Sequence, residues 1–344
     1  MKVVRSDDHR LHFPHGELSD GELVRPYECP ERWDHVVAAL NAAGMTDVVE
    51  PEHLELDLLL RVHDPAYVAF LRTAWTEWEE SGRHGDMIPT CFPTRRMAQH
   101  EPLEIDGRLG YFSFAAETAI TDGTWKASIA SAAIAKTAQK HVSAGESAAF
   151  ALCRPPGHHA GLDYFGGYCF INNAAIAAQG LLDDGAKRVA VLDIDFHHGN
   201  GTQDIFYNRS DVFFASIHGD PLSEFPYFSG FKEETGAGAG DGATRNYPLL
   251  PGTTFQEWVA ALDQALREID EYGAEALVVS LGVDTFADDP ISSFRLATED
   301  FLMVGRRIGR AGLPTVYCME GGYAVEEIGT NTVNVLIGHE EASP

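Results

Sequence analysis

The sequence is poor in positive charge and has no long apolar run. Among its 344 residues, 25 are Lys or Arg and 52 are Asp or Glu, which gives a formal net charge of −27. A surface of this kind repels nucleic acids and anionic membranes, and it attracts cations. No stretch approaches the roughly 18 uninterrupted apolar residues that a membrane-spanning helix needs. We therefore expect neither a nucleic-acid partner nor a membrane span.

Cysteine is also scarce. The five cysteines are scattered, odd in number, and never form a Cys-x-x-Cys pair. This pattern argues against a disulfide framework and against a thiolate zinc site. We expect all of them to be buried thiols that pack as small hydrophobes. The first residues are too charged for a secretory signal, so we expect a cytoplasmic location.

Short apolar runs alternate with helical stretches from residue 124 onward. The expected strands are 147–153, 188–195, 212–217, 276–283 and 315–319. The expected helices are 124–144, 172–183, 254–272 and 298–311. This alternation predicts parallel strands covered by helices on both faces. With 44% apolar residues and no repeat or low-complexity linker, the chain fits one large α/β domain.

The first 120 residues are less regular. They contain helical stretches near 31–43 and 65–80, followed by an irregular segment from 82 to about 105 that is rich in Arg, Pro, Thr and His. A structureless run of that length inside a compact domain usually serves as a lid or an interface. A merely mobile surface loop is the alternative.

Polar side chains gather where the predicted strands end. Asp193, Asp195 and His197 are spaced two residues apart at the end of one strand, so an extended backbone would point all three the same way. Asp284 follows another strand. In open α/β sheets, sites form at this carboxyl edge. Two carboxylates and one imidazole can ligate a divalent metal with one position open, and Zn²⁺ and Fe²⁺ both suit this set.

Two further motifs carry groups that are suited to hydrolysis. His158 and His159 stand in a stiff Pro-Pro-Gly loop, where one imidazole can act as general base and acid while the other supplies charge. Tyr323 follows a Gly-Gly turn after a predicted strand, and its hydroxyl could donate to an oxyanion when a carbonyl is attacked. Taken alone, a Gly-Gly-Tyr turn is more often structural.

Several segments, in this order and spacing, resemble the histone deacetylase superfamily: PPGHHA, LDIDFHHGNGTQDIFY, SLGVDTF and MEGGY. The resemblance covers nearly the whole chain, including VHDPAY near its start. It implies the arginase–deacetylase fold, a single α/β domain of residues 1–344 around a parallel sheet of eight strands with helices on both faces.

The same resemblance implies residue roles. The catalytic metal, Zn²⁺ with Fe²⁺ or Co²⁺ as alternatives, would be bound by Asp195, His197 and Asp284. The tandem pair would be His158 and His159, and the group that polarises the amide carbonyl would be Tyr323. The reaction implied is metal-assisted hydrolysis of an acetyl amide, in which the amine leaves after protonation.

One position departs from the nuclear, class I members, which read HHGDG where this chain has Asn200. By matching, His158 would pair with Asp193, whereas His159 would meet a neutral amide. A carboxylate raises the pKa of an imidazole far more than an amide does. We therefore predict that His158 is the more cationic and that His159 is the general base. The departure also puts a direct transfer of class I substrate preference in doubt.

Monovalent cation sites, for K⁺ or Na⁺, are implied by the resemblance alone. One would use Asp193, Asp195 and His197 with Ser216 and the carbonyl of Ile217. The other would use the carbonyls of Phe206, Arg209 and Val212.

Within the superfamily the chain resembles the acetylpolyamine amidohydrolases over the segments 107–123, 161–173, 219–228 and 289–291. In that group the long early loop, about 82–117 here, is an insertion that builds a homodimer and narrows the entrance to the active site. The matching acids at the entrance are Glu117 and Asp106. The matching walls and rim of the tunnel are Gly167, Tyr168, Phe225 and Ile291.

A slender, acidic entrance suits a small, flexible cation with an acetyl group at its tip. The resemblance therefore predicts hydrolysis of acetylated polyamines of the acetylputrescine, acetylcadaverine or acetylspermidine type. A lysine deacetylase that acts on acetylated peptides or proteins is the alternative within the superfamily. An inactive protein that binds acetylated ligands is the alternative of another class, and the complete set of expected metal ligands, tandem histidines and Tyr323 argues against it.

Overall fold

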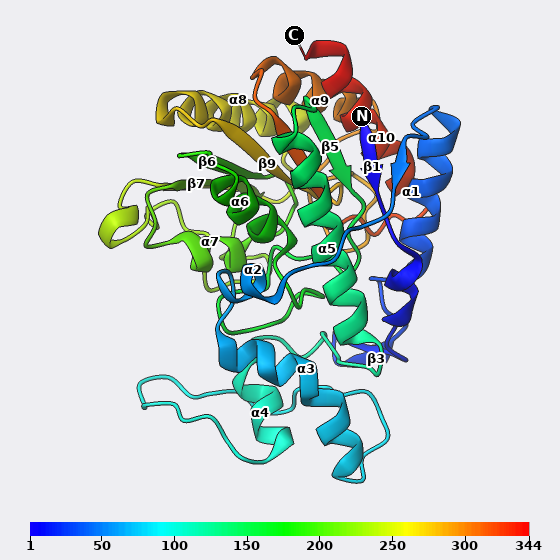
Figure 1. Cartoon of the computed structure of the whole chain (residues 1–344), viewed down its shortest axis with the longest axis vertical. Helices are drawn as coiled ribbons and strands as arrows, with labels where there is room; N and C mark the ends of the chain where they lie inside the picture. The colour runs from blue at the N-terminus through cyan, green and yellow to red at the C-terminus, as the bar shows by residue number, and fades with distance from the viewer. Residues whose placement is uncertain (344) are drawn as a thin grey trace.

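The computed structural model describes residues 1–343. Within them the centre is an eight-stranded sheet in which every neighbouring pair is parallel. Its order is β4 (Val48–Val49), β1 (Lys2–Val4), β5 (Ala148–Ala151), β10 (Thr315–Met319), β9 (Ala276–Leu281), β6 (Val189–Asp193), β7 (Val212–Gly219) and β8 (Thr244–Leu249). The expected sheet is thus confirmed (Figure 1).

Helices cover both faces of this sheet. The longer ones are α1 (Pro30–Ala42), α3 (Pro65–Glu80), α5 (Thr124–Ser143), α6 (Asn173–Asp183), α8 (Phe255–Tyr272), α9 (Asp300–Arg310) and α10 (Ile328–Ala342). The shorter ones are α2 (Leu56–Leu60), α4 (Ile105–Tyr111) and α7 (Asn200–Phe206), with 3-10 turns η1 (Asp7–Leu11) and η2 (Gly238–Gly240). A separate hairpin joins β2 (Glu17–Ser19) to β3 (Glu22–Val24).

Successive residues of the central strands alternate between two hydrophobic cores. In β10, Val316 and Cys318 belong to the core beneath α5 and α6. Tyr317 and Met319 belong to the opposite core, beneath α1, α8, α9 and α10. Strands that are buried on both faces read as continuous apolar runs. The central strands could therefore be recognised from the sequence.

The outer strands β1, β4 and β8, the hairpin, and helices α2, α7 and α10 were not found from the residues. β1 and β4 have only 3 and 2 residues. β8 carries Arg245, Asn246 and Pro248, so it lacks an apolar run. Proline is tolerated there because β8 is an edge strand.

The chain bends where strand β6 ends, at Asp193. The Asp193 Oδ1 atom accepts a hydrogen bond from the Asp195 N–H at 3.1 Å, and Asp195 Oδ1 accepts from the His197 N–H at 2.9 Å. Side-chain oxygens that bond to the backbone two residues on favour a turn over a strand. The prediction of extended backbone as far as His197 is therefore wrong, because the strand ends at Asp193. The side chains still gather in one place: Asp193 and Asp195 both face His158, at 3.0 Å and 3.8 Å, while Asp195 and His197 also meet Asp284.

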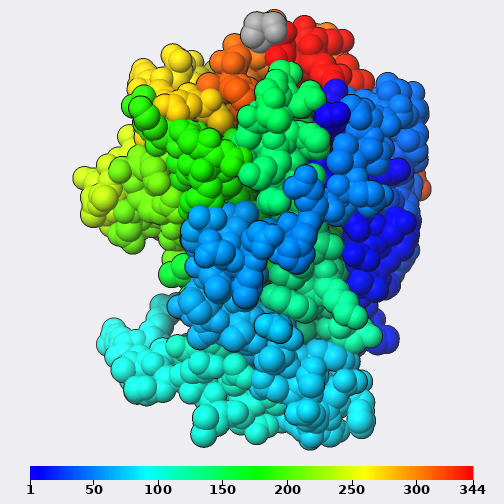
Figure 2. All heavy atoms as spheres, viewed as in Figure 1, coloured from blue at the N-terminus to red at the C-terminus, as the bar shows by residue number. Residues whose placement is uncertain are grey.

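The chain between α3 and α4 is irregular, as predicted, apart from a bridge between Met87 and Ile120. The later part of the expected insertion is regular, because α4 lies within it. This part of the chain forms the end of the molecule opposite α10, in cyan (Figures 1 and 2). One residue of the segment, Cys91, is exposed, so the expectation that every cysteine is buried is wrong. The segment has too little core of its own to cover the thiol.

None of the helices in residues 1–343 combines the length and the apolar character that crossing a lipid bilayer requires.

Candidate active site

A cavity of about 410 Å³ opens at the carboxyl edge of the sheet. Its lining comes from the loops that follow β5, β6, β7, β9 and β10, together with the β2–β3 hairpin and Glu117. A ligand site at the strand ends is the usual arrangement in an open α/β sheet. The fold therefore gathers residues far apart in sequence around one cavity.

Two carboxylates and one imidazole converge at the base of this region. The Nδ1 atom of His197 lies 3.3 Å from Asp195 Oδ1 and 3.1 Å from Asp284 Oδ2. Both carboxylates are fully buried, and among residues 1–343 neither pairs with a Lys or Arg side chain. Burial and the charge of Asp195 raise the pKa of Asp284 to about 7. A divalent cation among these donors would stabilise both anions, so the set fits Zn²⁺ or Fe²⁺.

Glycines leave room for these carboxylates. A Cβ atom on Gly321 would lie 2.5 Å from an oxygen of Asp195 and 2.5 Å from an oxygen of Asp284. The Gly321 N–H donates to Asp195 Oδ2 at 2.7 Å, and the Phe196 N–H donates to Asp284 Oδ1 at 2.8 Å. The backbone thus orients each carboxylate while its other oxygen stays near His197. This close approach explains the glycine that follows Glu320 in the sequence.

The adjacent histidines have different partners, as expected from the motifs. His158 Nδ1 lies 3.0 Å from Asp193 Oδ2, whereas His159 Nδ1 lies 2.6 Å from Asn200 Oδ1. Burial alone would lower the pKa of His158, but Asp195 and Asp193 together raise it to about 10. Burial, followed by the charges of His158 and His197, holds the pKa of His159 well below its ordinary value. The pair can therefore supply one cation and one neutral imidazole.

The hydrogen bond to Asn200 also fixes which nitrogen of His159 is free. An amide oxygen can only accept, so the proton of neutral His159 lies on Nδ1. Its Nε2 then carries a lone pair, and the ring lines the cavity. A neutral imidazole with a free acceptor is what a general base requires.

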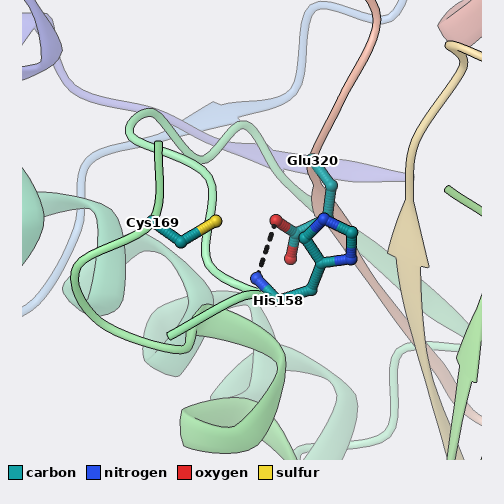
Figure 3. A group of neighbouring side chains, drawn as sticks. All are labelled: His158, Cys169 and Glu320. Carbon is teal, nitrogen blue, oxygen red and sulfur yellow. Dashed lines mark hydrogen bonds between the residues drawn. The ribbon is translucent and has the colours of Figure 1, made fainter. Parts of the chain in front are cut away.

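Glu320, which the sequence reasoning did not single out, supports the loop that carries both histidines. Its Oε2 accepts the N–H of Gly157 at 2.6 Å and the N–H of His158 at 3.2 Å. Figure 3 shows this carboxylate beside His158, with the sulfur of Cys169 facing it. These side chains lie close enough to share an ion. None of these three side chains lines the cavity, whereas His197 does, so we assign the cation to the Asp195 group instead.

Tyr323 lines the same cavity and is only 7% exposed. Burial raises the pKa of its phenol well above the ordinary value. The hydroxyl therefore stays protonated at neutral pH and can act as a hydrogen-bond donor. It is suited to stabilise an oxyanion that develops in the cavity.

The expected substrate-binding residues are mostly brought together. Those that line the cavity are Glu117, Gly167, Tyr168, Phe225 and Ile291. Glu117 Oε1 accepts the Gly167 N–H at 2.9 Å, which joins an acid to the wall. Asp106 is not among the lining residues of this single chain, because it lies in the first turn of α4.

Glu17 is a cavity acid that the sequence reasoning missed. It stands on the β2–β3 hairpin and accepts hydrogen bonds from the Tyr168 hydroxyl and the Tyr27 N–H, each at 3.0 Å. Burial raises its pKa to about 7. The hairpin had a sequence signal, because Asp20-Gly21 is a favoured two-residue turn. Nothing local to the sequence shows that Glu17 faces the cavity.

The residues expected to hold monovalent cations lie near strand β7. Ser216 Oγ is 2.8 Å from His218 Nδ1, and the carbonyl of Phe206 accepts the Arg209 N–H at 2.9 Å. Ile217 lies within β7 and Val212 begins it, whereas Asp193 ends the neighbouring β6. The binding of K⁺ or Na⁺ there stays a prediction.

Comparisons with known proteins agree with this geometry. The family model for the histone deacetylase domain matches residues 26–338. The chain is 55% identical over 345 residues to acetylpolyamine amidohydrolase 1 of Pseudomonas aeruginosa, covering 100% of both chains. It is 55% identical over 338 residues to acetylpolyamine amidohydrolase of Mycoplana ramosa, covering 98% of this chain and 99% of that one. A solved acetylpolyamine aminohydrolase from Burkholderia pseudomallei matches with a TM-score of 0.95 at 38% identity, over 100% of each chain.

Removal of one carboxylate donor should abolish metal retention. We expect Asp284→Ala to lose bound metal and activity, because two donors hold a divalent ion far less well than three. The wild type should lose activity to a strong chelator and regain it with Zn²⁺, Co²⁺ or Fe²⁺. Asp288→Ala, an exposed acid of the same segment, is the matched control. Metal content by mass spectrometry checks the outcome, and full metal and full rate in Asp284→Ala would refute the assignment.

The tandem histidines should contribute unequally. His159→Ala should lose far more kcat than His158→Ala at neutral pH, since a general base typically contributes about 10²–10⁴-fold.

Tyr323→Phe should lower kcat by roughly 10²–10³-fold while metal content is unchanged, because it removes an oxyanion donor and not a ligand. Steady-state kinetics with metal analysis measures both. Small and equal effects in all three variants would contradict the assigned roles.

Proposed function

The chain belongs to the histone deacetylase family, a metal-dependent family, and we propose that it hydrolyses acetylated polyamines to a free amine and acetate. The single observation that carries the proposal is the cavity itself. It joins the donor set of Asp195, His197 and Asp284 to a wall of carboxylates. The relatives of similar length that are named acetylpolyamine amidohydrolases support this substrate class.

The chain's own residues divide the chemistry among them. A bound metal, for which we propose Zn²⁺ with Fe²⁺ or Co²⁺ as alternatives, would polarise the acetyl carbonyl and activate water. His159 takes the proton from the attacking water through Nε2 and then gives it to the amide nitrogen, so that the C–N bond breaks and the free amine leaves. Tyr323 donates its hydroxyl hydrogen to the carbonyl oxygen as negative charge develops there. His158, held by Asp193, supplies positive charge beside the reacting atoms.

The amine end of the substrate meets acids on the cavity wall. Glu117 and Glu17 both line the cavity. The Tyr168 hydroxyl donates to Glu17, and the Tyr168 ring centroid lies 5.6 Å from that of Tyr323. A monoacetylated diamine carries its ammonium several carbons from the amide. An anion at that distance selects it over an uncharged acetylated amine. Asp106 does not line the cavity of its own chain. We propose that it contributes an acid only to the cavity of a second copy of the chain.

We also propose a homodimer through the irregular loop near 83–100, and K⁺ or Na⁺ at the two sets of residues near β7. The loop exposes Phe92 at 41% and Met97 at 67%, which favours packing against a partner. Its Arg95 lies 5.5 Å from the ring of Phe228, itself 77% exposed. This apolar surface would be covered in a dimer.

Loss of the wall charge should weaken the binding of cationic substrates only. We expect Glu117→Gln to raise KM for acetylputrescine up to about fivefold, or roughly 1 kcal/mol at most, in line with a partly solvated ion pair. An uncharged acetylated amine of equal length should respond little. The effect should shrink with added salt. If both substrates respond alike, Glu117 does not recognise charge.

The pH dependence of KM tests Glu17. Because the pKa of Glu17 is about 7, the carboxyl is mostly neutral below that pH and ionised above it. KM for acetylputrescine should therefore fall as pH rises from about 6 to 8, and Glu17→Gln should remove that fall. The uncharged analogue is the control substrate. A fall that persists in Glu17→Gln would assign the ionisation to another group.

The dimer is testable by sedimentation. The wild type should sediment as a dimer at micromolar concentration, and Phe92→Asp with Met97→Asp should shift it toward monomer. Leu250→Asp, which alters a residue that is 69% exposed outside the loop, is the matched control. A monomeric wild type with full activity would defeat this assembly.

A further inference from the structure

Two buried side chains of opposite charge hold the peptide that precedes Tyr323. The Arg32 Nε donates to the carbonyl of Gly322 at 2.6 Å. On the other side of the same peptide, Asp289 Oδ2 accepts the Tyr323 N–H at 2.6 Å. The Ala324 N–H donates to that same oxygen at 3.1 Å. The carbonyl and the N–H of one peptide are thus fixed by separate charged groups.

This peptide needs such support because of its backbone. Gly322 has φ +132°, a conformation that only glycine adopts readily. A Cβ atom there would lie 2.7 Å from Val283, so no side chain can stiffen the turn. The ring of Tyr323 packs beneath the Arg32 guanidinium, 4.8 Å from its centroid. The direction of the phenol therefore depends on how the 322–323 peptide is held.

Asp289 also reaches the rim of the cavity. Its Oδ1 accepts the Ile291 N–H at 3.2 Å, and both Pro290 and Ile291 line the cavity. The side chain is 6% exposed, and in residues 1–343 it forms no ion pair with Lys or Arg. The two oxygens of Asp289 thus accept backbone N–H groups from two segments: the cavity rim at Pro290 and Ile291, and the turn at residues 322–324, called the tyrosine turn below. A single carboxylate connects these two segments.

We propose that Asp289 is a positioning residue for Tyr323, one that fixes the tyrosine turn against the rim of the cavity. The proposal rests on the proposed function, in which the Tyr323 hydroxyl stabilises the oxyanion. Asp289 forms no hydrogen bond with Asp195, His197 or Asp284. It acts only through the backbone N–H groups of Tyr323, Ala324 and Ile291.

Asp289→Asn is the sharpest variant, because it keeps the shape and removes one acceptor. The single amide oxygen can serve either the tyrosine turn or the rim, and the NH₂ group then faces an N–H donor at the other. Loss of an entire oxyanion donor costs about 10²–10³-fold in kcat. Partial misplacement should therefore lower kcat roughly 10- to 100-fold with less than a threefold change in KM. Asp288→Asn, the exposed neighbour, makes the same charge change and is the matched control.

A double-mutant cycle separates positioning from general destabilisation. If Asp289 acts through Tyr323, Asp289→Asn should change kcat less than threefold once Tyr323→Phe has removed the hydroxyl. The same 10- to 100-fold loss in both backgrounds would overturn the proposal, as would an unchanged kcat in the wild-type background.

Hydrogen exchange tests the contact without any activity. In Asp289→Asn the amides of Tyr323 and Ala324 should exchange faster than in the wild type or in Asp288→Asn, because their acceptor is weakened. Unchanged exchange would overturn the proposal even if kcat falls. A wild type that hydrolyses no acetylated amine would instead refute the proposed function. The positioning role of Asp289 would then be tested by the hydrogen exchange of the Tyr323 and Ala324 amides alone.

Discussion

Asp195 and Asp284 are buried within reach of the same imidazole, and the rest of the site depends on this crowding of negative charge. Two buried anions this close are costly unless a cation or hydrogen bonds compensate them. The backbone supplies part of that compensation through the N–H groups of Gly321 and Phe196. The remaining oxygens are those that would bind the divalent ion proposed for this end of the sheet. Gly321 leaves room for both carboxylates, and the bend after Asp193 lets Asp195 and His197 meet Asp284.

The charges around the site give two identical side chains different protonation states. His158 lies against Asp193 and gains a proton, whereas His159 lies against Asn200 and stays neutral. The loop that carries them is held at two points. Glu320 holds its backbone, and the buried Arg154 side chain bonds to Glu28 at 2.8 Å. Because the loop is fixed, the two imidazoles keep different hydrogen-bond partners, and these partners make their pKa values differ.

The sequence predicted most of what is local. The central strands were found because burial on both faces leaves continuous apolar runs, and the motifs carried Asp195, His197, Asp284, His158 and Tyr323 into one site. Boundaries were less accurate, since side-chain hydrogen bonds ended β6 at Asp193 before its apolar pattern ended.

What the sequence could not provide were contacts between segments far apart in the chain. Glu17 meets Tyr168, and Asp289 meets the Tyr323 turn, across gaps that no periodicity encodes. Asp106 is a contact that the sequence predicted and the single chain does not form. The resemblance matched it to an acid at the entrance, but it does not line the cavity. A short edge strand such as β4 buries too little to leave a pattern.

The choice of substrate follows from the charge of the wall. Acids on the β2–β3 hairpin and Glu117 line the cavity. Asp289 connects the rim of this cavity, at Ile291, to the turn that carries Tyr323. The most direct test is kcat/KM of the metal-loaded wild type for acetylputrescine and for an acetyl-lysine peptide, measured side by side. We expect acetylputrescine to be hydrolysed at least tenfold more efficiently, about 1.4 kcal/mol in transition-state binding. A preference for the peptide would make the protein a lysine deacetylase, and turnover of neither would make it an acetyl-ligand-binding relative.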